Sequence, residues 1–467
     1  MLRLEKWSPC CKTSPAIRCR LVLHLMLDSS ATPSPARLTA YFVPLALQAA
    51  SQSLSYPLIA MVASHGPGGT LNLAGVAQSN ILMFLVGTMS AGLVTAGMVF
   101  ARTRIGFARF VAINNLLSFA TALVQGALCI PVVAHAVFGT LLGLPASIET
   151  PAEQAFPLTI LLNLLFNARN PYQVLLYNNG ASGRASLATF VRIGVTAALS
   201  PVFCSLGLVG PRWAMVCQTI PVALEVFVSW HYSRPFAAAL ADDHRPPPSR
   251  REILLFTLPL SLGGSLIALS GMILGAVIAR SGEPERMLPA YYLAAGLAAP
   301  AAYAASRVEN VVISFPPRSR EDSSTLRFSV AAGAIVSFIP LVFLLPGLSH
   351  WYYVTVQRLP PGDLSLVYTT ALLFVGFPIT VALRYHREGL AALSHRTPTI
   401  LAGDIAYLAA LAVSASVCLA LKVPGNIIGP VAVATSNLSS LGTLVLLLRE
   451  VRTDQEPPVA PVVSQEG

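Results

Sequence analysis

The chain has 467 residues, of which 54% are hydrophobic and only 11% are charged. Soluble domains carry about 25% charged residues, so this composition excludes a soluble globular protein, which would need more polar surface. The formal net charge is +10, and basic loops beside anionic lipid account for it without a nucleic-acid partner.

Long apolar runs recur from residue 39 to residue 449, each near the length of about 20 residues that crosses a bilayer as a helix. The runs are continuous and lack the alternation of transmembrane strands, which favours helices over a barrel. We therefore predict an all-α integral membrane protein with about 12 transmembrane helices. Their expected positions are 39–64, 73–100, 108–132, 155–178, 186–209, 213–232, 253–280, 289–315, 328–346, 366–386, 399–421 and 425–449.

Residues 1–38 differ from the rest, because their apolar run, LVLHLML, is short and contains a histidine. We expect a disordered N-terminal extension there and a disordered tail over residues 450–467. Met26 is an alternative start, so the sequence leaves open whether residues 1–25 belong to the protein. No cysteine spacing indicates a metal site, and we predict none.

The arginines indicate the orientation in the membrane. Assigning alternate loops to the cytoplasm gathers most of them on one side, as the positive-inside rule expects. Arg102 and Arg104 follow the second span, and Arg250 and Arg251 precede the seventh. We expect a multi-pass protein of the cell membrane, or of the inner membrane in a bacterium, with both termini in the cytoplasm.

Two halves share one plan. The polar linker 233–252, SRPFAAALADDHRPPPSRRE, separates a six-helix lobe at 39–232 from a second at 253–449. ARTR at 101–104 matches PRSR at 317–320, and VASHG at 62–66 matches IARSG at 278–282. Chance similarity among leucine-rich helices is the alternative. Repeats that share one orientation are related by an axis along the membrane normal, as in transporters that rock two bundles around a central site.

An asparagine stripe marks the fourth span. Asn163, Asn167 and Asn170 are spaced i, i+4, i+7 and share one helical face. Such a face is costly against lipid, so it lines a wet cavity or makes hydrogen bonds between helices. We favour the cavity. Arg169 lies at the edge of the stripe, where a snorkelling interfacial side chain is the alternative.

Arg192 and Asp404 occupy equivalent places in the fifth and eleventh spans with opposite charges. We expect them to face one another across the lobe interface as an ion pair that breaks when the lobes move. Alternatively, Arg192 binds an anionic substrate while Asp404 carries a coupling proton or Na⁺. A fixed structural pair, or two separate interfacial charges, would serve neither role.

Further charged residues fall within the spans. Arg307 and Asn310 share a face of the eighth span and are cavity candidates, while Glu309 points elsewhere. The candidates for a coupling ion are Asp404, Glu309, Glu225 and His386, with a protonated buried carboxyl as the alternative for Glu225. The slight excess of arginine among these groups favours an anionic substrate.

Two segments carry a family resemblance. GTMSAGLVTAGMVFARTR at 87–104 and FPITVALRYHREGLAAL at 377–393 resemble helices of the progressive ankylosis branch of the MOP superfamily. This superfamily of exporters and flippases includes the multidrug and toxic compound extrusion (MATE) transporters and polysaccharide flippases. The resemblance implies a MATE-like fold of two pseudo-symmetric six-helix bundles. It also makes Arg384 and His386 candidates to face the central cleft.

The sequence departs from MATE exporters, which often use an acidic residue of the first or seventh helix for cation coupling. Here the first helix has Gln48 and Gln52, and no acid lies between Phe256 and Ala279. The chain has no GxxxxGK[ST] loop for binding ATP, so we do not expect it to power transport by hydrolysing ATP itself.

We predict a secondary-active transporter or flippase, not an enzyme, that exports an amphipathic or anionic solute by alternating access. A lipid-linked oligosaccharide flippase is one alternative, and an integral-membrane glycosyl- or acyltransferase is an alternative of another class. The expected partners are membrane lipid and a small-molecule or lipid-linked substrate. We expect a monomer without cofactor, with H⁺ or Na⁺ as possible coupling ions.

Overall fold

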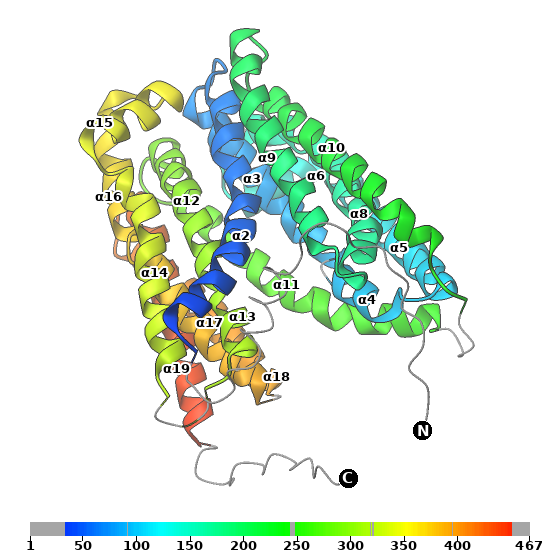
Figure 1. Cartoon of the computed structure of the whole chain (residues 1–467). Helices are drawn as coiled ribbons and strands as arrows, with labels where there is room; N and C mark the ends of the chain where they lie inside the picture. Colours follow the sequence, from blue (N-terminus) through cyan, green and yellow to red (C-terminus); the bar gives the residue numbers. More distant parts are fainter. Residues whose placement is uncertain are drawn as a thin grey trace, which may run out of the picture.

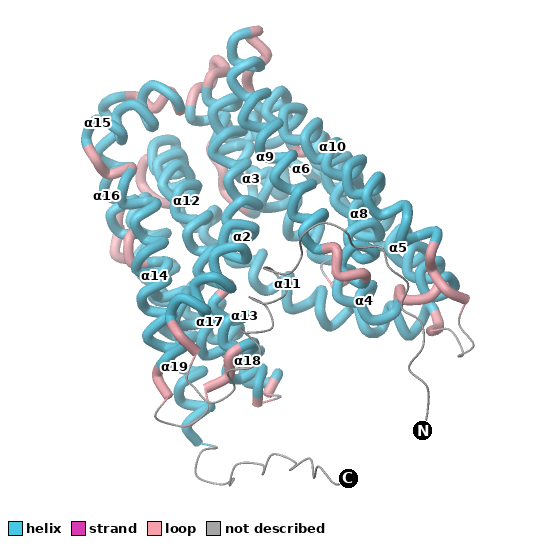
Figure 2. Tube along the Cα trace, in the orientation of Figure 1, coloured by secondary structure: helices cyan, strands magenta, loops and turns pink. Residues whose placement is uncertain are grey.

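The computed structural model describes residues 33–450 except for 91, 243–247, 318, 320–321 and 395. The proposed start at Met26 and nearly all of the predicted tail lie outside these residues. The described chain consists of helices and short connections, without a strand (Figure 2). The first helix begins at Pro35, before the predicted position 39, because Ser34 caps it and proline suits the first helical turn.

The amino-terminal half contains the following helices: α2 (Pro35–Ser64), α3 (Thr70–Gly87), η1 (Thr88–Ser90), α4 (Leu93–Phe100), α5 (Arg104–Leu128), α6 (Pro131–His135), η2 (Ala136–Leu141), α7 (Ala146–Ala155), α8 (Leu158–Asn178), α9 (Ser182–Ser205) and α10 (Pro211–Ala238). The carboxy-terminal half contains α11 (Arg250–Ala279), α12 (Pro284–Ser306), α13 (Val308–Ser314), α14 (Ser324–Val342), α15 (Pro346–Ser349), η3 (His350–Val356), η4 (Pro361–Asp363), α16 (Leu364–Phe374), α17 (Phe377–Leu393), α18 (Thr397–Ala420) and α19 (Gly425–Glu450).

The two halves repeat one another element by element. α2 begins at residue 35 and α11 at 250, α6 at 131 and α15 at 346, and α9 at 182 and α18 at 397, so each pair is separated by 215 residues. A π-helical segment follows α6 as η2 and follows α15 as η3. Because π-helices are rare, their recurrence at one place in both halves confirms the repeat, and chance similarity does not explain it.

Eight helical segments in the described chain are long and apolar enough to cross a membrane, with α3–α4 and α16–α17 each counted as one continuous segment. α2, α8, α11 and the broken pair α12–α13 bring the arrangement to the twelve spans expected from the sequence. α8 is less apolar because it carries the asparagine stripe and Arg169.

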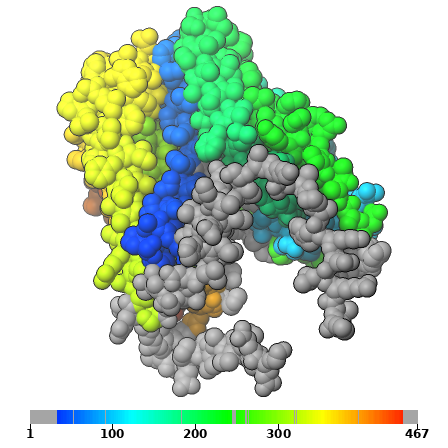
Figure 3. Space-filling view, viewed as in Figure 1, coloured from blue at the N-terminus to red at the C-terminus, as the bar shows by residue number. Residues whose placement is uncertain are grey.

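The halves form two helical bundles that diverge toward the end where α2 begins and α19 ends (Figure 1). We call this the terminal end, and the opposite end, which carries α6 and α15, the distal end. The coloured surfaces of the two halves also separate toward the terminal end in the space-filling view (Figure 3).

The first helix of each half crosses between the bundles. Toward the terminal end, Leu38 and Phe42 of α2 belong to a hydrophobic core with residues of α12, α13 and α17. Ile253 of α11 likewise belongs to a core built from α4, α5 and α8. Further along, α2 contacts α9 and α10, and α11 contacts α18 and α19. These two helices therefore hold the halves together while leaving space between them.

Candidate functional site

A cluster of three charges lies inside the amino-terminal half. Glu225 of α10 is completely buried. Its Oε1 accepts hydrogen bonds from Arg169 Nη1 at 2.9 Å and from the Thr189 hydroxyl at 2.9 Å. Its Oε2 accepts from Arg192 Nη1 at 3.0 Å. We call Arg169, Arg192 and Glu225 the amino-terminal charge cluster.

This cluster has two guanidinium groups for one carboxylate. Both oxygens of Glu225 are already bound by arginine, an arrangement that favours the ionised carboxylate over the protonated one and leaves little room for a coupling cation. One positive charge stays uncompensated within the cluster. The Nε atoms of Arg169 and Arg192 are buried and have no hydrogen-bond partner among the described residues. Buried donors of this kind call for an acceptor.

A polar cavity of about 330 Å³ lies beside the cluster. Arg169 and Arg192 line it together with the whole asparagine stripe, Asn163, Asn167 and Asn170. Tyr303 of α12 also lines it, so both halves contribute to the cavity. The cavity role that the sequence predicts for the stripe therefore agrees with the geometry.

The stripe also makes the hydrogen bonds between helices that were its alternative role. Asn163 Nδ2 donates to the Met83 carbonyl at 3.1 Å and to Gln125 Oε1 at 2.9 Å. Asn170 Nδ2 donates to Asn114 Oδ1 at 3.3 Å. These contacts fix α8 against α3 and α5, so the polar wall is held in place before any ligand arrives.

An apolar cavity of about 290 Å³ adjoins the polar one. It lies between α2 and α3 of one half and α12 of the other, with Ile59, Leu73 and Leu293 among its lining residues. Tyr56, Phe84 and Tyr303 line both cavities. The space between the halves thus has a cationic, amide-rich compartment next to an apolar one, and the three aromatic side chains lie where the two adjoin.

The carboxy-terminal half holds a second cluster of three charges, of opposite net sign. Arg384 Nε donates to Glu388 Oε1 at 2.7 Å, and its Nη2 donates to Asp404 Oδ1 at 2.6 Å. The guanidinium also lies over the Tyr407 ring, 4.8 Å from its centroid. Two carboxylates here face one arginine. We call Arg384, Glu388 and Asp404 the carboxy-terminal charge cluster.

The predicted pair between Arg192 and Asp404 is wrong for this structure. Arg192 binds Glu225 and Asp404 binds Arg384, each within its own half. The physical reason is that α9 and α18 pack against α10 and α17 of their own bundles, and these neighbours offer opposite charges at hydrogen-bonding distance.

His386 and Arg384 do not line either of the two cavities. The His386 ring is buried, and its Nε2 lies 3.2 Å from the Thr325 hydroxyl of α14. Both side chains therefore serve contacts inside the carboxy-terminal bundle, in contrast to the cleft position that the family resemblance implies.

Arg307, Glu309 and Asn310 lie where α12 breaks into α13 and are partly buried. Their side chains make no hydrogen bond or ion pair within the part of the chain that the structure describes. Arg307 and Asn310 line neither of the two cavities, so their cavity-lining role stays a prediction.

Arg169 is the cavity residue that the sequence analysis left undecided. The sequence does contain a sign that Arg169 is buried. Arg169 and Arg384 are separated by 215 residues, which is the spacing at which the two halves repeat. An arginine that recurs at one depth in both halves is better explained by a buried partner than by snorkelling.

The distal end is closed by contacts between the halves. Arg280, at the end of α11, donates to the carbonyls of Leu141 at 2.7 Å and Leu142 at 2.8 Å, at the end of η2. Gly143 has a φ of 69°, and a side chain there would meet the Arg280 guanidinium at 3.0 Å. Further distal contacts join Ser147 to Glu285 and Gln357 to the Pro57 carbonyl.

We expect Arg280→Ala to open the distal end, because charge-assisted hydrogen bonds are each worth about 1.5–3 kcal/mol. A cysteine placed at Ala295, in the apolar cavity wall, should react about tenfold faster with an impermeant maleimide added from the distal side of reconstituted vesicles. Arg286→Ala is the matched control, since Arg286 pairs with Glu283 and Asp363 of its own half. Equal labelling in both variants would show that the Arg280 hydrogen bonds to Leu141 and Leu142, which we call the distal latch, do not hold the distal end closed.

No protein-family model and no curated protein sequence matches the chain. Solved structures do. An inward-facing multidrug resistance MATE family transporter of the MOP superfamily matches with a TM-score of 0.62 at 14% identity, covering 90% of this chain and 99% of that one. The lipid II flippase MurJ, in an inward closed conformation, matches with a TM-score of 0.65 at 10% identity, covering 89% and 87%. An outward-facing MATE family transporter gives 0.55 at 16% identity, covering 90% and 97%.

These matches show that the chain shares its fold with a MATE family transporter and with the lipid II flippase MurJ. The all-α, MATE-like fold class predicted from the sequence is confirmed. The closer likeness to the progressive ankylosis branch stays a prediction.

Proposed function

We propose that this protein is a secondary-active transporter or flippase that carries an amphipathic or anionic solute across the membrane. The observation that carries the proposal is the pair of unpartnered Nε donors of Arg169 and Arg192 in the polar cavity. An anionic head group fits these donors, and the adjoining apolar cavity fits a hydrocarbon tail.

The conformation supports loading from the terminal end. The halves are latched at the distal end and diverge at the terminal end. The TM-score to the inward-facing MATE structure also exceeds that to the outward-facing one. With both termini placed in the cytoplasm, as the arginine distribution indicates, the substrate enters from the cytoplasmic side and leaves outward.

The carboxy-terminal charge cluster is the place where we propose coupling to H⁺ or Na⁺. Its two carboxylates exceed its single arginine, and the nearby helix α13 carries Glu309, which is partly buried and makes no hydrogen bond or ion pair within the described part of the chain. Asp404 and Glu309 are therefore better placed to take up a cation than Glu225, whose oxygens are bound by two arginines. A ligand or ion drives such a change only through different affinities for the two states.

A lipid-linked oligosaccharide flippase is the second candidate, favoured by the continuity between the polar and apolar cavities. We propose a monomer for either function, because one chain forms both cavities and both charge clusters.

Proteoliposomes test the proposal. We expect short-chain fluorescent amphiphiles with a phosphate head group to cross faster than matched zwitterionic or quaternary ammonium probes, and an imposed pH or Na⁺ gradient to change the rate. A polyprenyl-diphosphate-linked sugar moving in preference to the short probes would identify the flippase. Protein-containing vesicles no faster than empty ones for every anionic probe would refute transport of this class.

A further inference from the structure

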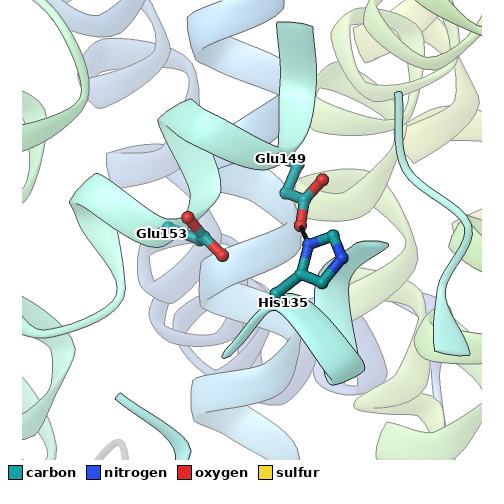
Figure 4. A group of neighbouring side chains, drawn as sticks. All are labelled: His135, Glu149 and Glu153. Atoms are coloured by element: carbon teal, nitrogen blue, oxygen red, sulfur yellow. Dashed lines mark hydrogen bonds and ion pairs between the residues drawn. The ribbon is translucent and has the colours of Figure 1, made fainter. Parts of the chain in front are cut away.

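A histidine and two glutamates meet outside the central space, at the distal end of the amino-terminal half. His135 ends α6, and Glu149 and Glu153 lie one turn apart on α7. Figure 4 shows the imidazole and both carboxyl groups turned toward one another. One ligand atom from each residue lies within 4.8 Å of the others.

The three side chains differ in how they are partnered. His135 Nδ1 lies 2.6 Å from Glu149 Oε1. Glu153 has no hydrogen bond or ion pair within the part of the chain that the structure describes, although its carboxyl faces the same gap. Partial burial and the neighbouring Glu149 raise the pKa of Glu153. An ordinary histidine–glutamate pair explains two of these residues and leaves the third unexplained.

Gly139, on η2, leaves room for the cluster. A Cβ at this position would lie 2.6 Å from Glu149 Oε1 and 2.9 Å from the His135 ring. Any side chain larger than that of glycine would therefore push the carboxylate and the imidazole apart.

We propose that His135, Glu149 and Glu153 bind a divalent transition-metal ion of the zinc class. Zinc is bound by imidazole nitrogens and carboxylate oxygens, and a site with three protein ligands keeps a fourth position for water. Bonds of about 2.1 Å in tetrahedral geometry place ligand atoms about 3.4 Å apart. The cluster reaches this spacing if the His135–Glu149 contact widens slightly and Glu153 moves inward. The imidazole favours Zn²⁺ over Mg²⁺ and Ca²⁺, which prefer oxygen ligands.

An ion bound by these three residues would also affect the structure around it. It would tie α6 to α7 across η2, whose last carbonyls accept the hydrogen bonds of Arg280 from the other half. Zinc binding should therefore stiffen the segment that receives the distal latch.

The repeat supplies a matched control. His350 lies 215 residues after His135, at the start of the second π-helical segment, and is also exposed. The positions that correspond to Glu149 and Glu153 are Leu364 and Tyr368, which offer no carboxylate. The carboxy-terminal half thus has a histidine at the equivalent position without the two carboxylates.

Zinc binding to the full-length purified protein tests the proposal. The measurement is competition between the protein and a chromophoric zinc chelator, in a background with Cys10, Cys11 and Cys19 replaced by serine, because thiolates bind zinc independently. We expect one Zn²⁺ per chain. His135→Ala and Glu153→Gln should each weaken binding by at least about tenfold, whereas His350→Ala should leave it unchanged.

Two outcomes would overturn the proposal. One is that the protein with all three ligands intact competes for no zinc at one equivalent per chain. The other is that His135→Ala and His350→Ala weaken binding equally, which would indicate scattered surface histidines. Glu153→Gln keeps the shape of the side chain and preserves the His135–Glu149 pair, so its effect separates zinc binding from a general loss of folding.

Discussion

Glu225→Ala is expected to destabilise the protein more than any other single substitution in the charge clusters. The change leaves Arg169 and Arg192 in the bundle without their shared carboxylate. Removing one partner from a buried ion pair costs about 3–5 kcal/mol, because the remaining charge stays uncompensated. The measurement is thermal unfolding of the detergent-solubilised protein, together with the fraction that elutes as a single species in size-exclusion chromatography.

Replacing the whole cluster separates charge imbalance from lost packing. The triple variant Arg169→Met/Arg192→Met/Glu225→Met should recover most of the stability, since apolar residues of similar volume often substitute for a complete buried ion cluster without loss. Glu388→Ala is a matched control from the other half. It should cost less, because Arg384 keeps Asp404. Wild-type stability of Glu225→Ala would show that the arginines find other partners.

Arg169→Ala is expected to reduce transport of an anionic probe at least about tenfold while leaving the fold intact. Arg169 lines the polar cavity with an unpartnered Nε, and a hydrogen bond to a charged group is worth about 1.5–3 kcal/mol. Arg192 and Glu225 remain paired in this variant, so no buried charge is left without an oppositely charged partner. The measurement is the initial rate of probe flux into proteoliposomes containing equal amounts of protein.

Two further arginine variants control this experiment. Arg169→Lys should keep part of the rate, because lysine supplies the charge without the planar donor set of guanidinium. Arg184→Ala should transport normally, since Arg184 stacks on Tyr232 and Phe236 away from both cavities. Undiminished flux through Arg169→Ala, at matched protein content, would remove Arg169 from the substrate path.

Much of the fold could be predicted because membrane crossing is a local property of the chain. Each span must be long, apolar and internally hydrogen-bonded, so its position shows in the sequence itself. The repeat could also be predicted from the sequence, since its matching polar segments recur at a nearly constant spacing. The asparagine stripe could be placed on one face because helical periodicity fixes which residues are neighbours.

The partners of the buried charges could not be predicted in the same way. Arg192 and Asp404 are 212 residues apart, three short of the 215-residue spacing of the repeat, so they are not equivalent positions, and each binds a residue of its own half. Repeat spacing identifies equivalent positions, whereas an ion pair forms between whichever opposite charges packing brings within about 4 Å. Residues on adjacent helices, such as Arg192 and Glu225, can satisfy that condition at many sequence separations.

The apolar runs and their helical period were enough to predict twelve membrane-spanning helices in two similar halves, with a polar stripe in the fourth span. The place of Arg169 in the cavity wall, the opposite net sign of the two charge clusters and the approach of His135 to Glu149 and Glu153 follow from how the helices pack. The difference is physical. Hydrophobicity and helical period act along the chain, whereas charge pairing and ligand geometry depend on distances of a few ångströms between helices that packing alone sets.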